Sequence, residues 1–280
     1  MIGALLMTAA LFAQEPSPAI LPNGVVNYRD HVSIDQKLGD ELDLSLPFRD
    51  EQGEAVRLGD YFGERPVILV LAYYECPMLC TMVLNGTVKS LRAIRDLDCG
   101  EDFELVVVSI DPGEHHELAA EKRATYVEQY TAKSRRTSEG EGWHFLTGDE
   151  ESIRALAEQV GFRYVYDPKT DEYAHASGIM VATPSGELAR YFYGVEFIAK
   201  DIRLGLIEAS EGKIGTLADK ILLLCYHYDP ATGKYGLLVA NITRVLGAIT
   251  VLLIGGSIIK MIRRDRRVAS ARLEEAPHVG

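Results

Sequence analysis

The stretch PVILVLAYYECPMLC, residues 66–80, decides the predicted fold class of this chain. Residues 67–72 are an unbroken apolar run rich in β-branched side chains, which is typical of a strand buried on both faces of a sheet. Cys76 and Cys80 follow directly, and apolar residues then recur at helical spacing up to about Asp96. The sequence therefore predicts a central strand, a cysteine-bearing loop and a helix, in that order.

Strands and helices are predicted to alternate along the rest of the body. The further predicted strands flank a turn at 50–53 and lie at 103–110, at 143–146 and in a hairpin over 178–192. The further predicted helices lie at 115–130, at 150–160 with Gly161 as the C-cap, and at 198–209. This alternation predicts an α/β fold with a mixed sheet flanked by helices. Since a strand, a cysteine loop and a helix form the active-site arrangement of thioredoxin, the predicted domain, residues 41–212, is thioredoxin-like.

The two cysteines are spaced to act together. Cys76 and Cys80 straddle the predicted start of a helix, where backbone N–H groups and the helix dipole favour thiolate. Side chains four residues apart face the same way from one helical turn, so the two sulfurs can bind one metal ion or close a disulfide. Soft thiolate ligands select Cu(I), Zn(II) and related ions.

His175 is the candidate for a third ligand, because two thiolates rarely complete a site that also holds Cu(II). It lies just before the first strand of the predicted hairpin. In thioredoxin-like folds that loop faces the cysteine pair and usually carries a cis-proline, but this chain has no proline between Pro168 and Pro184. The alternative is a polar surface histidine beside Asp171 and Glu172.

Four segments together resemble the Sco/SenC family of copper chaperones. They are YYECPMLC at 73–80, SIDPGEHHELAAEKRATY at 109–126, LTGDEESIRALAEQVGF at 146–162 and YAHASGIMVATPSGEL at 173–188. The likeness extends over about residues 42–208. It implies a thioredoxin fold, copper as Cu(I) or Cu(II), and a role in assembling the copper centre of cytochrome c oxidase subunit II, with a copper donor and a thiol reductase as further partners.

The resemblance also implies a ligand set. Cys76, Cys80 and His175 match the family's copper ligands. Asp111 matches the acidic residue of the family's aspartate–proline loop, where it would either support the metal ligands through hydrogen bonds or cap the following helix. Thr81 departs from the family, since many members have proline there. An oxidoreductase that uses Cys76 and Cys80 as a redox-active pair remains the main alternative, ahead of a peroxiredoxin-like peroxidase and a copper sensor.

The charge and the N-terminus indicate where the protein works. The formal net charge of −12 argues against nucleic acid as a partner, because phosphate binding needs a basic face. Residues 1–13 are almost wholly apolar and end at a small residue, which predicts a signal peptide. Residues 14–40 are rich in proline and polar residues, which predicts a flexible N-terminal arm.

The C-terminal third predicts a membrane anchor. A juxtamembrane segment, 213–236, leads into an apolar stretch, 237–262, that reaches the length of a transmembrane helix. The tail, 263–280, begins with a cluster of arginines, so the positive-inside rule places it in the cytoplasm. We therefore expect a single-pass protein of the cell membrane with its domain on the extracytoplasmic, periplasmic side.

Five other residues were weighed as ligands. Met78 and Met82 flank the cysteine pair, and packing on a helix face is the favoured role for both over thioether ligation. Cys99 is predicted to be structural. Cys225 and His227 lie between the domain and the predicted anchor. Their spacing is compatible with a secondary copper site, but an ordinary juxtamembrane turn is the favoured interpretation.

Overall fold

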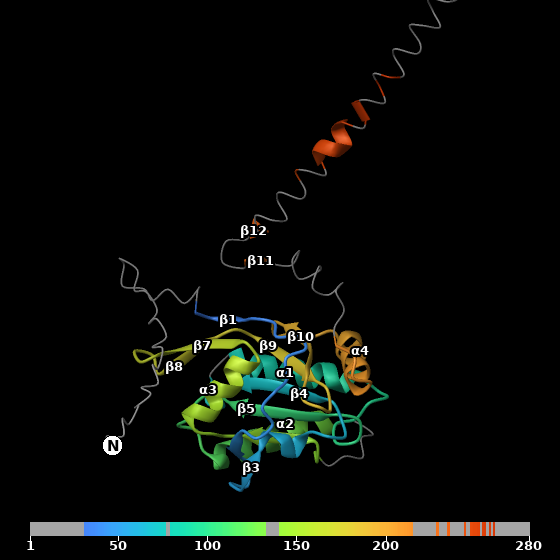
Figure 1. Ribbon diagram of the computed structural model, residues 1–280. Coiled ribbons are helices and arrows are strands. Elements are labelled where there is room, and N and C mark those ends of the chain that lie inside the picture. Colours follow the sequence, from blue (N-terminus) through green and yellow to red (C-terminus); the bar gives the residue numbers. More distant parts are fainter. Residues whose placement is uncertain are drawn as a thin grey trace, which may run out of the picture. The chain divides into compact units, whose positions relative to one another are not determined.

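The computed structural model describes residues 31–76, 79–132 and 140–214, and beyond them 228–229, 234–235, 244, 247–252, 254–255, 258 and 260. The chain divides into two units, Met1–Gly215 and Thr216–Gly280, which are described separately. Figure 1 shows the first unit as a sheet with helices packed around it.

A five-stranded mixed sheet lies at the centre of the first unit, in the order β10-β9-β4-β5-β6. Its strands are β4 (Val67–Ala72), β5 (Glu104–Ser109), β6 (Trp143–Leu146), β9 (Gly178–Ala182) and β10 (Leu188–Tyr193). β4, β5 and β6 run parallel, whereas β9 is antiparallel to both β4 and β10. Every residue of β4 and β9 is buried, as their apolar sequences require. The predicted mixed α/β fold is confirmed.

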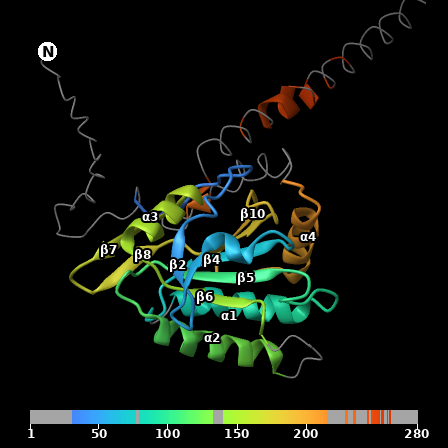
Figure 2. The same cartoon turned by 60° about the horizontal axis from the view of Figure 1, so that its bottom comes forward.

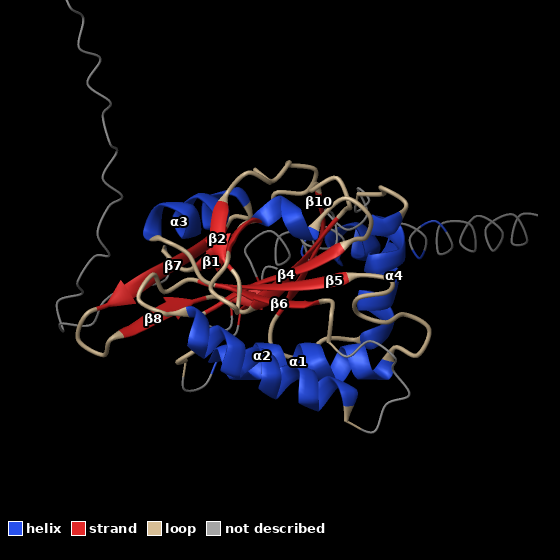
Figure 3. Ribbon diagram, turned by 90° about the horizontal axis from the view of Figure 1, so that it is seen from below, coloured by secondary structure: helices blue, strands red, loops and turns tan. Residues whose placement is uncertain are grey.

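Four helices cover this sheet. They are α1 (Leu79–Ala93), α2 (His116–Thr131), α3 (Glu150–Gln159) and α4 (Ala199–Ser210), and all four were predicted. α1 and α2 lie side by side on one face, and α3 lies on the other (Figure 3). Figure 2 shows α4 beside β10, at the far side of the sheet from β7 and β8. In this layered arrangement the helices cover the faces of the sheet, and the loops at the strand ends remain available for functional residues.

A second, three-stranded sheet was not predicted. β7 (Phe162–Asp167) pairs with β8 (Glu172–His175) on one side and with β1 (Ser33–Ile34) on the other. The sequence FRYVYD of β7 alternates aromatic residues with others, and this period of two was the available signal. A predicted two-stranded element is confirmed as β2 (Pro47–Arg49) paired with β3 (Ala55–Arg57), followed by a short 3-10 helix, Leu58–Tyr61.

Residues 31–40 belong to the domain, which corrects the prediction of a flexible arm over 14–40 for this part of the chain. The Asp35 N–H donates to the Gly161 carbonyl at 2.8 Å, and the Gly39 N–H donates to the Leu188 carbonyl at 2.9 Å. Gly161 has φ +67°, and a Cβ there would lie 1.9 Å from the Asp35 oxygen. Only glycine therefore permits both the predicted end of α3 and the close passage of this segment.

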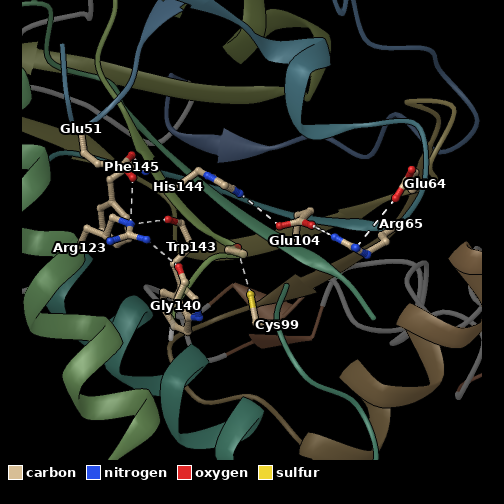
Figure 4. Close-up of polar contacts among 11 residues, drawn as sticks. Glu51, Glu64, Arg65, Cys99, Glu104, Arg123, Gly140, Trp143, His144 and Phe145 are labelled. Atoms are coloured by element: carbon tan, nitrogen blue, oxygen red, sulfur yellow. Dashed lines mark hydrogen bonds and ion pairs between the residues drawn. The ribbon is translucent and has the colours of Figure 1, made fainter. Parts of the chain in front are cut away.

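Two largely buried carboxylates, Glu104 and Glu51, join separate elements of the domain (Figure 4). Glu104 bonds to Arg65 at 2.5 Å and to His144 at 3.1 Å. Glu51 bonds to Arg123 at 2.9 Å, and the Arg123 guanidinium also donates to the carbonyls of 140 and 143. Because these charges are paired and hydrogen-bonded, they are tolerated inside the fold.

The second unit contains a short hairpin, in which β11 (Tyr228–Asp229) pairs with β12 (Lys234–Tyr235). No helix among the described residues combines the length and the apolar character needed to cross a bilayer. Most of the predicted membrane segment, 237–262, lies outside the described residues, and the residues described within it are helical. The predicted signal peptide, 1–13, and the basic tail, 263–280, also lie outside them.

Candidate metal centre

The cysteine loop connects β4 to α1. Cys80 is the second residue of α1, and its backbone N–H donates to Cys76 Sγ at 3.3 Å. This contact places the Cys76 sulfur at a helix N-terminus, where the dipole stabilises thiolate. The Thr81 hydroxyl donates to the Cys76 carbonyl at 3.4 Å, a contact that a proline at position 81 could not make. The chain between the cysteines, 77–78, lies outside the described residues.

His175 reaches the cysteines from the other sheet, as the last residue of β8. Its Nε2 lies 3.0 Å from Cys80 Sγ, across 95 residues of sequence, and its Nδ1 lies 2.8 Å from the Ala176 carbonyl oxygen. A carbonyl can only accept, so Nδ1 carries a proton, and the neutral imidazole presents its Nε2 lone pair to Cys80. In metal-binding histidines the ring nitrogen that does not bind the metal typically donates a hydrogen bond to a carbonyl or carboxylate, which fixes the orientation of the ring.

The three donor atoms form one compact group. The two sulfurs and a ring nitrogen of His175 lie within 4.8 Å of one another, and Cys76, Cys80 and His175 are 7%, 2% and 8% exposed. No disulfide joins the cysteines. Hydrogen bonding to Cys76, then burial, raises the pKa of the Cys80 thiol, so the metal-free pair retains a proton that an incoming cation must displace. Two soft sulfurs and one imidazole fit a copper or zinc ion.

Aromatic rings wall the group. Tyr73 lies edge-on to His175 at 6.0 Å between ring centroids, and the Phe162 ring centroid lies 5.8 Å from that of His175. Tyr173 packs against Tyr73 at 5.5 Å. The pKa of the Tyr73 hydroxyl is raised, mainly by burial and to a smaller extent by a hydrogen bond to Cys76. These rings exclude water, which strengthens electrostatic interactions inside the site.

Glu114 is the main site residue that the sequence analysis missed. Its carboxylate accepts the Tyr74 N–H at 2.8 Å, the Glu75 N–H at 2.7 Å and the Ser109 hydroxyl at 2.5 Å. Tyr74 and Glu75 immediately precede Cys76. Burial raises the pKa of Glu114, and the three hydrogen bonds partly offset that effect. No local pattern marks this residue, because its partners come from a different loop.

Asp111, two residues after the end of β5, contacts the strand that carries His175. Within the described chain its carboxylate accepts the Gly113 N–H at 2.8 Å and the Tyr173 hydroxyl at 3.4 Å. It therefore contacts the strand that carries His175 without contacting the imidazole itself. The alternative of a helix cap is wrong, because α2 begins after His115, whose side chain makes no capping bond.

Of the remaining candidate ligands, the structure describes Cys99 and Met82. Cys99 is fully buried and donates from its sulfur to the Gly142 carbonyl at 3.0 Å, which confirms a structural role. Figure 4 includes this contact. Met82 is 45% exposed, so the prediction that it packs on a helix face is wrong: position 82 lies on the outward side of α1. Met78, Cys225 and His227 lie outside the described residues.

The SCO1/SenC family model matches residues 36–203, which is more than half of the chain. The chain belongs to the SCO1/SenC family. The matched region contains all three candidate ligands and both carboxylates of the loop after β5. No curated protein sequence matches the chain.

The chain is similar to several solved structures. An Aquifex aeolicus VF5 protein to which electron transfer is ascribed has a TM-score of 0.54 at 21% identity, covering 63% of this chain and 96% of its own. A SCO1/SenC family lipoprotein from Bacillus anthracis str. Ames has a TM-score of 0.50 at 16% identity, covering 64% and 99%. Arabidopsis thaliana ScoI, solved with copper bound, has a TM-score of 0.47 at 17% identity, covering 60% and 96%.

Proposed function

We propose that this member of the SCO1/SenC family is a copper chaperone. Cys76 and Cys80 hold the ion through thiolates, and His175 supplies an imidazole that suits Cu(II) as well as Cu(I). The protein then gives copper to an extracytoplasmic acceptor, of which subunit II of cytochrome c oxidase is the expected example. The C-terminal segment anchors it to the membrane with the domain outside the cytoplasm.

One observation carries this proposal. The His175 Nε2 lone pair faces Cys80 Sγ at 3.0 Å, inside a group of three donors that are all more than nine-tenths buried. Thiol exchange has no need of an imidazole beside both sulfurs, whereas a three-coordinate copper site does. With three protein donors among the described residues, the ion keeps room for an entering ligand, so an acceptor can take it by stepwise ligand exchange.

A thiol–disulfide oxidoreductase is the second candidate. The close Cys76 and Cys80 sulfurs at a helix N-terminus favour it, because that setting promotes thiolate attack and disulfide closure. The two roles are compatible, since a copper acceptor must be reduced before it is loaded. They differ in their dependence on the histidine.

His175→Ala separates the two functions. It should weaken copper binding by at least about 10–100-fold, and Cu(II) more than Cu(I), because it removes the imidazole ligand. Disulfide formation and reduction between Cys76 and Cys80 should continue at a rate near wild type. Chelator competition measures the affinity, and a thiol-exchange assay on the same preparation measures the second activity.

His116→Ala is the matched control, since His116 is a half-exposed histidine on α2 that pairs with Glu117. It should leave both activities unchanged. Normal copper binding by His175→Ala together with lost exchange activity would reverse the assignment in favour of the oxidoreductase.

A further inference from the structure

The loop after β5 holds the cysteine loop through one carboxylate. Both oxygens of Glu114 are used: one accepts the Tyr74 N–H, and the other accepts the N–H of the next residue, Glu75. Glu114 is 7% exposed, so water cannot easily replace it as the acceptor. The two residues whose backbone it holds lead directly into Cys76.

The sheet explains why this loop is in reach. β4 and β5 are parallel neighbours, with Ala72 opposite Ser109, so the loops that follow them leave the same edge. The Ser109 hydroxyl donates to Glu114 and thereby orients the carboxylate toward the cysteine loop. Asp111, in the same turn, bonds to Tyr173 on β8, two residues before His175. One short turn thus contacts both chain segments that supply ligands.

We propose that Glu114 is a positioning residue for the metal centre, which fixes the backbone before Cys76 so that its sulfur meets Cys80 and His175 in binding geometry. A carboxylate suits this task because it is an acceptor only and can take two adjacent N–H groups at once. The link to copper rests on the proposed function, whereas the effect on the cysteine loop does not.

Two substitutions test the role. Glu114→Ala removes both acceptors, and Glu114→Gln leaves one oxygen but turns an NH₂ group toward the other backbone donor. In the full-length protein, both should lower copper affinity by roughly 10–100-fold, as expected for a group that orients a ligand. Both should also shift the thiolate-to-Cu(II) charge-transfer band, a signature that a general loss of stability would not move.

Amide hydrogen exchange in the metal-free protein provides a second, independent measurement. The Tyr74 and Glu75 amides should exchange at least about tenfold faster in Glu114→Ala, while the amides of β4 itself keep their protection. Glu117→Gln is the matched control, because Glu117 is a nearby acidic residue in the first turn of α2 whose side chain is exposed. It should leave affinity, spectrum and exchange unchanged.

The outcomes are distinct. Faster exchange at Tyr74 and Glu75 with weakened copper binding supports the proposal. Unchanged exchange, or an unchanged copper spectrum and affinity in Glu114→Ala, overturns it. If the wild-type protein bound no copper, the proposed function would fail, while the exchange data would still show whether Glu114 positions the cysteine loop.

Discussion

Single atoms determine what the centre can bind. The Ala176 carbonyl accepts the proton of His175 Nδ1 in a hydrogen bond. This leaves Nε2, which faces Cys80, as the ring nitrogen that can bind a metal ion. The Cys80 N–H, in turn, contacts the Cys76 sulfur. Two of the three candidate ligands, His175 and Cys76, are therefore held by hydrogen bonds to nearby backbone groups before a metal arrives. Such preorganisation reduces the rearrangement needed on binding.

Oxidation of the cysteine pair should switch copper binding off. Closing a Cys76–Cys80 disulfide removes both thiolates, and only thiolate is a strong ligand for soft ions. The oxidised apo protein should therefore lose most of its copper stoichiometry, and a thiol reductant should restore it. Mass spectrometry of the bound metal before and after reduction measures the effect. Equal uptake by both forms would contradict the thiolate assignment.

At the scale of elements, α1 must lie close to the loop before α4. Gly86 is buried on α1, and a Cβ there would lie 1.9 Å from the Val195 carbonyl oxygen. A helix interior normally disfavours glycine, so this close approach outweighs helix propensity at that position. Cys80, a candidate metal ligand, is the second residue of the same helix, so the placement of α1 bears on the site.

Gly86→Ala should destabilise the domain by about 1–3 kcal/mol, because the new methyl group can be accommodated only by moving α1 or the loop. Urea unfolding followed by circular dichroism measures the change. Asn85→Ala is the control: Asn85 is exposed on the same helix, and the change should stay within about 0.5 kcal/mol of wild type. Equal stability of the two variants would show that α1 has room to shift.

At the scale of the whole molecule, Glu104 on β5 forms a charged cluster with His144 on β6 and with Arg65, which lies just before β4. Burial acts to raise the pKa of Glu104, but hydrogen bonds and positive charge from His144 and Arg65 more than offset it and lower that pKa overall. The Glu104 side chain is only 12% exposed. Its ionised form is therefore favoured more strongly in the folded protein than in the unfolded chain.

The sign of the pH dependence follows. Since the folded pKa of Glu104 is depressed, its contribution is fully present above the unfolded value of about 4.3 and is lost as the pH falls through the folded value. Glu104→Gln should cost about 1.5–3 kcal/mol at neutral pH and should flatten the loss of stability in acid. Denaturant titrations between about pH 3 and 7 test this.

Glu64→Gln is the matched control for that experiment. Glu64 also faces Arg65, at 3.9 Å, but its side chain is 88% exposed. An exposed pair of this kind contributes little, so both stability and its pH profile should remain near wild type. An unchanged acid profile in Glu104→Gln would refute the proposed linkage.

Local sequence patterns by themselves determined the central strand, the cysteine loop and the helix after it. An apolar run and a helical period are properties of neighbouring residues, so they are legible without knowledge of the fold. The spacing of Cys76 and Cys80 likewise determined that their sulfurs can act together. His175 was predicted from its order in the chain and from family resemblance, not from any local feature.

Only the tertiary structure decided the surroundings of those residues. Glu114 reaches the cysteine loop because β4 and β5 are parallel neighbours, and His175 reaches Cys80 because β8 ends beside α1. The strand β7 carried a short alternating pattern that was not used, whereas β8 has no such pattern and is stabilised by its pairing with β7. Contacts between distant segments depend on how the whole chain packs, and no window of sequence contains both partners.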